Sequence, residues 1–254
     1  MSEVIVESAR GICRIELARP EKKNALTQRM YRQLADAMAT AEADPQVRVL
    51  LLHGAADCFA AGNDLHDFLA SPRLDDDAPA VCFLMALATT GKPLVAAVAG
   101  PAVGIGTTLL LHCDFVYASP DARLQMPFVA LGLVPEAGSS LLLPQAIGHL
   151  RAAELLLLGR PIDARRACEL GLVTEIVQRE QLLARAHATA ASLAALPPEA
   201  LQQTKRLLKR DRLDDVIERI RDELRIFGER LDSVETRDAI SRFFDRAKPG
   251  GKPD

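Results

Sequence analysis

The chain has no Trp and only 4% aromatic residues among its 254, so it lacks the side chains on which nucleic-acid bases usually stack. It also lacks an excess of positive charge, because 31 Lys and Arg residues face 34 Asp and Glu residues and the formal net charge is −3. Proteins that neutralise phosphate backbones are normally basic. We therefore expect no nucleic acid among the partners of this protein.

A disulfide pattern and a secretion signal are also missing. The five cysteines, at positions 13, 58, 82, 113 and 168, are odd in number and form no CxxC pair. Such spacing is typical of reduced thiols rather than of a disulfide framework. The first ten residues, MSEVIVESAR, have neither the basic start nor the long apolar stretch of a signal peptide. These features predict a cytoplasmic protein.

One uncharged run raises the question of a membrane. The eighteen residues of Leu94–Leu111 carry no charge, which is long enough for a membrane-spanning helix. Gly100, Pro101, Gly104 and Gly106 interrupt the run in its middle, so a strand, a loop and a helix fit it better. We expect no membrane association.

Common cofactor and catalytic motifs are absent as well. The glycine-rich segment lacks the third glycine of the dinucleotide fingerprint, because Leu109 stands there, and no Gly-Lys-Ser/Thr follows. The sequence has no GxSxG elbow, and its five histidines show no metal-ligand spacing. We therefore expect no metal, no redox cofactor and not the simplest type of hydrolase.

Short apolar runs alternate with helical patterns over about 180 residues, which predicts an α/β domain with largely parallel strands. We expect a hairpin, a helix that Thr27 caps and that runs to Glu42, a helix from Gly106 to Leu111, and further strands. The expected hairpin and strands are Val4–Val6 with Gly11–Leu17, then Val47–Leu52, Leu94–Val98, Phe115–Tyr117, Leu124–Met126 and Val173–Val177. The segment Leu74–Pro79 is typical of a mobile surface loop.

The last part of the chain differs in character. From Pro198 onward glycine becomes rare, and apolar residues follow a heptad-like spacing of under three repeats. These residues are Leu213, Ile217, Ile220, Leu224, Phe227 and Leu231. The stripe fits either a helical subdomain that covers its own or a neighbouring core, or a helix that binds a partner. We divide the chain into a core, residues 1–195, and a C-terminal helical trimerisation or lid region, residues 196–254.

Two glycine-containing loops each follow an expected buried strand and precede an expected helix. They are the segments 59–65, FAAGNDL, and 100–106, GPAVGIG. Backbone N–H groups at such helix starts have no partner within the helix, and they can stabilise negative charge that develops on an oxygen. Two such loops after two strands of one sheet could supply two converging donors. One loop alone would be a weak signal.

At these residues the sequence resembles the crotonase superfamily, also called the enoyl-CoA hydratase/isomerase family. The resemblance covers residues 1–248. It is carried by Lys23–Leu26 (KNAL), Phe59–Leu65, Lys92–Gly104 (KPLVAAVAGPAVG), Met126–Gly138 (MPFVALGLVPEAG), Leu158–Ala164 (LGRPIDA) and Ala167–Val173 (ACELGLV). It implies a spiral of ββα units with a helical C-terminal region, coenzyme A thioesters as substrates, and homotrimers or hexamers. Coenzyme A then enters as part of the substrate, not as a separate cofactor.

The resemblance also implies a set of site residues. The backbone amides of Asn63 and Ile105 would form the oxyanion hole. Residues of the two loops and their neighbours would bind the substrate and its coenzyme A: Lys23, Ala25, Ala61, Gly62, Leu65, Gly104, Thr108 and Phe128. The two carboxylates of hydratases are missing, because Thr108 and Phe128 stand in their places. Neither side chain can activate a water molecule.

Glu136, in the segment Leu133–Ser140 (LVPEAGSS), occupies the place of the catalytic Glu in peroxisomal-type Δ3,Δ2-enoyl-CoA isomerases. The resemblance therefore implies an isomerase in which one carboxylate moves a proton from C2 to C4. Phe128 and its apolar neighbours would exclude water and raise the Glu136 pKa by desolvation. An atypical hydratase, another enolate reaction on acyl-CoA, or a non-catalytic acyl-CoA-binding protein are the alternatives.

Two positions qualify this expectation. In the isomerase branch the residue before Gly-Pro is commonly Asn, and in some members it supports the catalytic Glu; here it is Ala99. Asp64 lies beside the first loop, where a carboxylate is more often a helix cap or an ion-pair partner than a second acid. The sequence therefore does not show which residue orients the Glu136 side chain.

Overall fold

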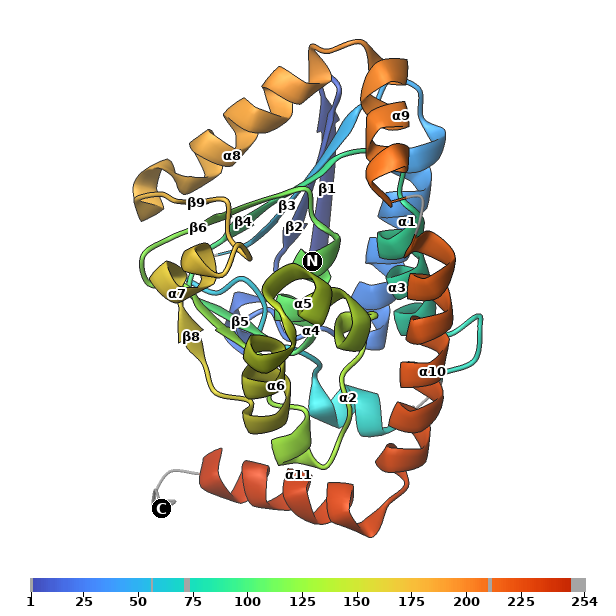
Figure 1. The fold of residues 1–254 in the computed structure, drawn as a ribbon, viewed down its shortest axis with the longest axis vertical. Helices are drawn as coiled ribbons and strands as arrows, with labels where there is room; N and C mark the ends of the chain where they lie inside the picture. Colours follow the sequence, from blue (N-terminus) through green and yellow to red (C-terminus); the bar gives the residue numbers. More distant parts are fainter. Residues whose placement is uncertain (1, 56, 71–73, 210–211, 248–254) are drawn as a thin grey trace.

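The computed structural model describes residues 2–55, 57–70, 74–209 and 212–247, and its larger sheet has six strands (Figure 1). Only its first two strands pair antiparallel; all later neighbours are parallel. In spatial order the strands are β1 (Val4–Ala9), β2 (Ile12–Leu17), β3 (Val49–Gly54), β4 (Leu94–Val98), β6 (Phe115–Ala118) and β9 (Glu175–Ile176). The hairpin and the parallel α/β arrangement are thereby confirmed.

A smaller sheet holds β5 (Pro101–Val103), β7 (Arg123–Gln125) and β8 (Ile162–Asp163). The chain passes repeatedly from the large sheet to the small one, from β4 to β5 and from β6 to β7. A parallel bridge between Ala60 and Ala102 ties the segment after β3 to β5 in the same way. The units β4–β5 and β6–β7 thus give one strand to each sheet, as expected for a spiral of ββα units.

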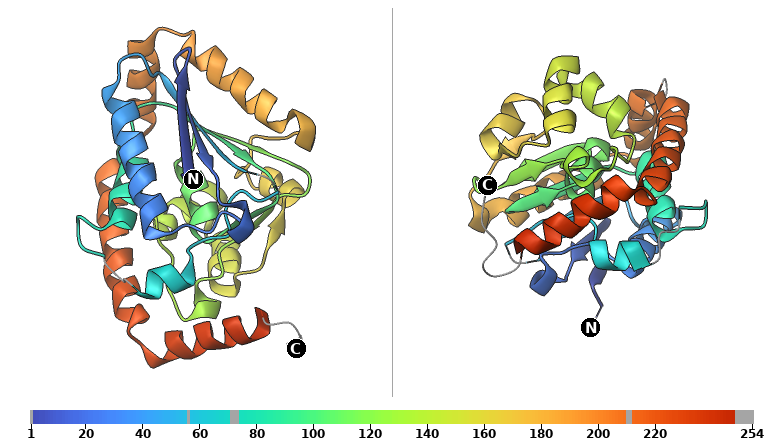
Figure 2. Two further views of the ribbon diagram at one scale, coloured as in Figure 1. Left: turned by 180° about the vertical axis from the view of Figure 1, so that it is seen from behind. Right: turned by 90° about the horizontal axis from the view of Figure 1, so that it is seen from below.

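Helices cover both faces of the large sheet (Figures 1 and 2). On one face α8 (Arg179–Ala194) buries Leu182, Ala186 and Ala190 against the apolar side chains of β3 and β4. On the other face lie α1 (Gln28–Ala43) and α3 (Pro79–Thr89). Thr27 caps α1 with a 3.1 Å bond from the Met30 amide, so the helix begins where the sequence predicts.

The remaining helical segments of the core are short and lie around the smaller sheet. They are η1 (Pro20–Lys22), α2 (Leu65–Ala70), α4 (Ile105–Thr108), η2 (Leu109–His112), η3 (Val129–Leu131), α5 (Ser139–Ile147), α6 (His149–Leu158) and α7 (Ala164–Glu169). The uncharged run 94–111 forms β4, β5, α4 and η2. The predicted strand is confirmed, the predicted loop contains the short strand β5, and the predicted helix begins at Ile105 and continues from Leu109 as a 3-10 helix. No helix among the described residues is long and apolar enough to cross a membrane.

Three helices form the C-terminal region: α9 (Pro198–Lys209), α10 (Leu213–Leu231) and α11 (Val234–Ala247). The long α10 runs past α3 and α5, and α11 turns back across the end of the molecule beneath η3 (Figure 2). Four members of the predicted stripe are buried on α10 together with Val216, whereas Leu213 and Ile217 are only half-buried. The stripe covers the chain's own core, which supports the first of its two interpretations.

Several predicted bounds are corrected. The strand predicted at 47–52 begins at Val49, because Asp44 and its neighbours still form a turn. The strand predicted at 173–177 shrinks to Glu175–Ile176, and α3 was not predicted at all. Pro79 is the first residue of α3 rather than the end of a loop, and residues 71–73 before it lie outside the described ranges. All five cysteines are free thiols.

Candidate active site

The two glycine loops meet side by side at the small sheet. The Ala60 amide donates to Pro101 O at 3.1 Å, and the Val103 amide donates to Ala60 O at 2.9 Å. Gly106 makes the approach possible, since a Cβ there would lie 2.6 Å from Ala60 O. The parallel bridge therefore sets the register of one loop against the other.

Both loops then turn through glycines that have positive φ. Gly62 has φ +92°, and Gly104 has φ +54° with ψ −120°, a region that L side chains rarely adopt. Asn63 and Ile105 follow directly, each three residues after its partner in the bridge. Within the described part of the chain no hydrogen bond occupies the backbone amide of either residue. Two unpaired N–H groups on adjoining loops are what an oxyanion hole requires.

A cavity of about 290 Å³ opens beside these loops. The predicted substrate-binding residues Ala25, Ala61, Gly62, Leu65, Gly104 and Phe128 line it, together with Asn63 and Ile105. Lys23 is exposed outside the lining, and its neighbour Lys22 takes that place. The carbonyl of Lys23 instead accepts the Ala61 amide at 3.0 Å, so Lys23 shapes the loop through its backbone.

Glu136 lies deeper, at a second and smaller cavity that also involves α1, α2, α3 and α10. Asn63 and Phe227 line both cavities, so the two cavities adjoin at these residues. The Glu136 residue is only 6% exposed. Its carboxylate accepts a hydrogen bond from the Thr108 hydroxyl. Thr108 itself lines neither cavity, and it contacts the carboxylate in place of the substrate contact that the resemblance implies.

The surroundings of Glu136 favour its protonated form. The pKa of this carboxyl is raised to about 8, chiefly by burial; the Thr108 hydrogen bond lowers it and the negative charge of Glu223 raises it by smaller amounts. A carboxyl group near neutrality can both accept and return a proton at physiological pH. The upward shift of the Glu136 pKa agrees with the desolvation that the sequence predicts.

The two qualifying positions have clear structural roles. Asp64 accepts from Arg19 Nη1 at 2.8 Å and from the amides of His66 and Asp67 at the start of α2, so it is an ion-pair partner and a helix cap. Ala99 lies at the margin of the apolar cluster under α8. The Glu136 carboxylate is oriented by Thr108 rather than by residue 99.

Sequence reasoning missed several residues around the site. The Tyr31 hydroxyl, on α1, donates to the Asn63 side-chain oxygen at 2.5 Å. The His66 ring stacks on Phe244 of α11 at 4.2 Å, and both rings line the larger cavity. Tyr31 and Phe227 lie on apolar helix faces, where the sequence gives no signal that separates a site residue from a core residue. Among the described residues no group of His, Cys, Asp and Glu is arranged to hold a metal ion.

Comparison with known proteins agrees with this geometry. The sequence profile described as Enoyl-CoA hydratase/isomerase matches residues 7–252. The chain is 34% identical to 1,2-epoxyphenylacetyl-CoA isomerase of Escherichia coli over 263 residues, which cover 98% of each protein. It is 38% identical to rat enoyl-CoA delta isomerase 2 over 214 residues, 82% of this chain but only 54% of that relative, so it spans about half of the rat protein.

Solved structures show the same fold. Pseudomonas aeruginosa OdaA is 44% identical and superposes with a TM-score of 0.94 over 97% of this chain and 100% of that one. An enoyl-CoA hydratase/isomerase from Pseudoalteromonas atlantica is 40% identical, with a TM-score of 0.93 over 98% of this chain and 99% of its own. The fold is the crotonase fold with a helical C-terminal region, and the chain belongs to the enoyl-CoA hydratase/isomerase family.

Proposed function

We propose that this protein is a Δ3,Δ2-enoyl-CoA isomerase. The observation that carries the proposal is the buried Glu136 carboxyl, with its pKa near 8, at a cavity that shares Asn63 with the cavity of the two unpaired amides. A hydratase needs two acid–base groups to add the elements of water, and Thr108 and Phe128 supply neither. Rat enoyl-CoA delta isomerase 2 is named for this reaction class, and the Escherichia coli relative is named for the isomerisation of a different coenzyme A thioester, an epoxide.

The reaction needs only one carboxylate. The C2 protons of a 3-enoyl thioester are acidic because the carbonyl and the double bond both delocalise the resulting charge. Glu136 takes one of these protons, and the electron pair moves into a dienolate whose oxygen accepts from the Asn63 and Ile105 amides. The Glu136 carboxylic acid then delivers the proton to C4, the carbonyl re-forms, and a conjugated 2-enoyl thioester results. No water and no second base takes part.

The surroundings support isomerisation over hydration. The side chains that face Glu136 in the smaller cavity are mainly apolar: Phe68, Leu74, Ala80, Leu84, Leu224 and Phe227. A cavity lined in this way holds little water that could attack the double bond. The larger cavity has the Lys22 cation at its edge, which suits an anionic coenzyme A moiety. Coenzyme A is therefore part of the substrate in this proposal.

The proposal is tested by mixing the purified protein with 3-hexenoyl-CoA and following the ultraviolet absorbance of the conjugated thioester. Hydration of crotonyl-CoA is measured alongside. We expect conjugation without hydration. Hydration without conjugation would show an atypical hydratase, and two flat traces together with coenzyme A binding would show a non-catalytic binding protein.

A further inference from the structure

The backbone directly after Glu136 is unusual. Ala137 has φ +61° and Gly138 has φ +70°, so two consecutive residues adopt the left-handed conformation before α5 begins. Glycine adopts it freely, but Ala137 carries a side chain and is completely buried. A non-glycine residue keeps such a conformation only where its surroundings enforce it.

Two buried polar side chains from different elements hold this turn. His112, at the end of η2, donates from Nε2 to the Ala137 carbonyl at 2.8 Å. Glu223, on α10, accepts the Gly138 amide at 2.6 Å and the Ser140 amide at 2.8 Å. Both side chains belong to residues that are only 5% exposed. Every one of these contacts lies within four residues of Glu136.

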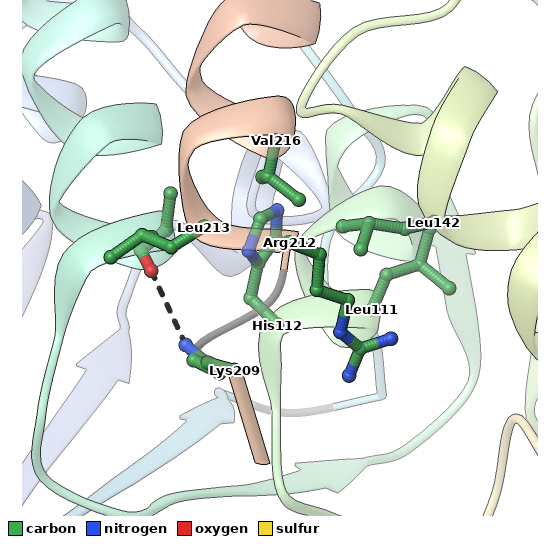
Figure 3. Close-up of a pocket in the computed structure, with 8 residues that line it drawn as sticks. Leu111, His112, Leu142, Lys209, Arg212, Leu213 and Val216 are labelled. Atoms are coloured by element: carbon green, nitrogen blue, oxygen red, sulfur yellow. Dashed lines mark hydrogen bonds between the residues drawn. The ribbon is translucent and has the colours of Figure 1, made fainter. Parts of the chain in front are cut away.

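The chemistry of His112 suits a fixed donor. Burial lowers the pKa of this imidazole to about 4, so the ring is neutral at physiological pH and carries one N–H. Because a carbonyl oxygen can only accept, that proton lies on Nε2. In Figure 3 the His112 ring points toward the first turns of α10, beside Val216. The nearby Lys209 donates elsewhere, to Ala88 O at 3.4 Å.

We propose that His112 and Glu223 are positioning residues for Glu136. They clamp the left-handed turn at Ala137 and Gly138 from η2 and α10, and so keep the Glu136 carboxylate against the Thr108 hydroxyl. The inference rests on the proposed function, since it concerns the base of that reaction. It also explains how the carboxylate is oriented in a chain that has Ala99 where Asn is common.

The clamp has a measurable consequence for protonation. Besides burial, the groups that act on the pKa of Glu136 are the Thr108 hydroxyl on α4 and the Glu223 carboxylate on α10. The Tyr31 hydroxyl on α1, at the same cavity, donates to Asn63 instead. Glu223 itself faces Ser140 and the Arg219 cation. His112→Leu removes the donor to Ala137 O and alters none of these groups. The hydrogen bond from Thr108 keeps the pKa of Glu136 lower than burial alone would make it. A carboxyl group that is released from the turn loses this bond, so its pKa rises.

The test compares His112→Leu and Glu223→Gln with His112→Gln, which keeps an N–H donor at a similar reach. Two variants serve as controls elsewhere in the molecule. His53→Leu removes a second buried histidine. Asp114→Asn changes a solvent-accessible carboxylate that, like Glu223, accepts a backbone amide, here that of Leu94 at 2.7 Å, and that also pairs with Lys205. The readouts are kcat and KM for 3-hexenoyl-CoA, and infrared titration of the protonated carboxyl band that Glu136→Gln abolishes.

We expect His112→Leu and Glu223→Gln each to lower kcat about tenfold or more with KM changed less than about threefold, because misplacing a catalytic group by about 1 Å can cost up to a hundredfold. The double variant loses less than the product of the two, since both act on one turn. His112→Gln restores most of kcat, and the controls change thermal stability only. In His112→Leu the infrared midpoint moves to higher pH.

A kcat within about twofold of wild type in both variants, with an unmoved midpoint in His112→Leu, would overturn the positioning role. The infrared titration measures the protonation of Glu136 and does not depend on catalytic activity. If the wild-type protein does not isomerise 3-hexenoyl-CoA, the proposed function fails, while a midpoint that moves in His112→Leu and not in His53→Leu still supports the clamp.

Discussion

Thr108 and burial act on the Glu136 carboxyl in opposite directions. Burial among apolar side chains disfavours the carboxylate, and the Thr108 hydroxyl stabilises it by donating a hydrogen bond. By the family resemblance, position 108 holds a carboxylate in hydratases. In this chain it holds a hydroxyl group that donates a hydrogen bond to Glu136, the proposed base. In the proposed isomerase, Thr108 therefore tunes the pKa of the carboxyl that moves the proton.

Thr108→Val should therefore raise the pKa of Glu136 above about 8. The smaller carboxylate fraction at pH 7 lowers kcat/KM there, and the loss shrinks as the pH approaches 9. Thr108→Ser keeps the hydroxyl and serves as the control. The pH profile of kcat/KM checks this, and a profile that Thr108→Val leaves in place would contradict the role of the hydroxyl.

The same pKa makes Glu136 a source of instability at alkaline pH. In the unfolded chain the carboxyl titrates near 4.5, so between pH 4.5 and about 8 the folded protein binds more protons than the unfolded one. The contribution of the protonated carboxyl to stability is complete below pH 4.5 and is lost as the pH rises through about 8.

Glu136→Gln abolishes this loss. The free energy of unfolding of the variant minus that of wild type should increase by about 3–5 kcal/mol between pH 5 and pH 9. Urea denaturation at each pH measures it, and the subtraction cancels the other titrating groups. A difference that is independent of pH would mean that Glu136 is ionised in the folded protein.

At the scale of elements, the proposed oxyanion hole depends on two loops held in register by the Ala60–Ala102 bridge. The hole needs a glycine directly before each donor, because only glycine allows the chain to turn there without strain. A side chain at Gly104 would fit in the space available, because the nearest atoms to its Cβ would lie 4.0 Å away. It would instead disfavour the backbone conformation of residue 104 and so move the Ile105 amide. The effect on function is therefore one of backbone direction, not of crowding.

Gly104→Ala is compared with Gly171→Ala as a control. Gly171 also has a positive φ, +79°, and a Cβ added there would meet open space. Both variants should lose about 1–3 kcal/mol of stability through backbone strain. Only Gly104→Ala should also lose kcat, by about 10²-fold or more, as when one oxyanion donor is removed. Equal activity in the two variants would show that the Ile105 amide does not stabilise the transition state.

Elements with a periodic pattern and a cap were predictable from the sequence, as α1 with its Thr27 cap shows. Helix α3 was not, because its segment PAVCFLMALAT is apolar on all sides and looks the same as a buried strand. The two loops and Glu136 were predictable from motifs. His112, Glu223 and Tyr31 were not, because only tertiary packing brings these distant segments to the site.

At the scale of the whole molecule, the C-terminal helices complete the site. Phe227 of α10 and Phe243 and Phe244 of α11 close the larger cavity, and α10 carries Glu223. Large apolar side chains nevertheless remain exposed on α6, where Leu150 is 83% and Leu157 66% exposed. Such a surface is typical of one that is buried in an assembly.

The family resemblance implies trimers or hexamers, and we expect sedimentation to give three or six times the 27.5 kDa of one chain. A Leu150→Lys, Leu157→Lys double variant should shift the distribution toward smaller species, because it puts two charges into the expected interface. An unchanged assembly in the variant would exclude the outer face of α6 as the contact. A wild-type monomer at all concentrations would contradict the expectation itself.

The measurement that tests the central claim most directly is the turnover of 3-hexenoyl-CoA by wild type and Glu136→Gln, with coenzyme A affinity measured for both. If Glu136 is the single base, the variant loses about 10²–10⁴-fold or more in kcat and binds coenzyme A as wild type does. A variant that isomerises within about tenfold of wild type would show that another group moves the proton.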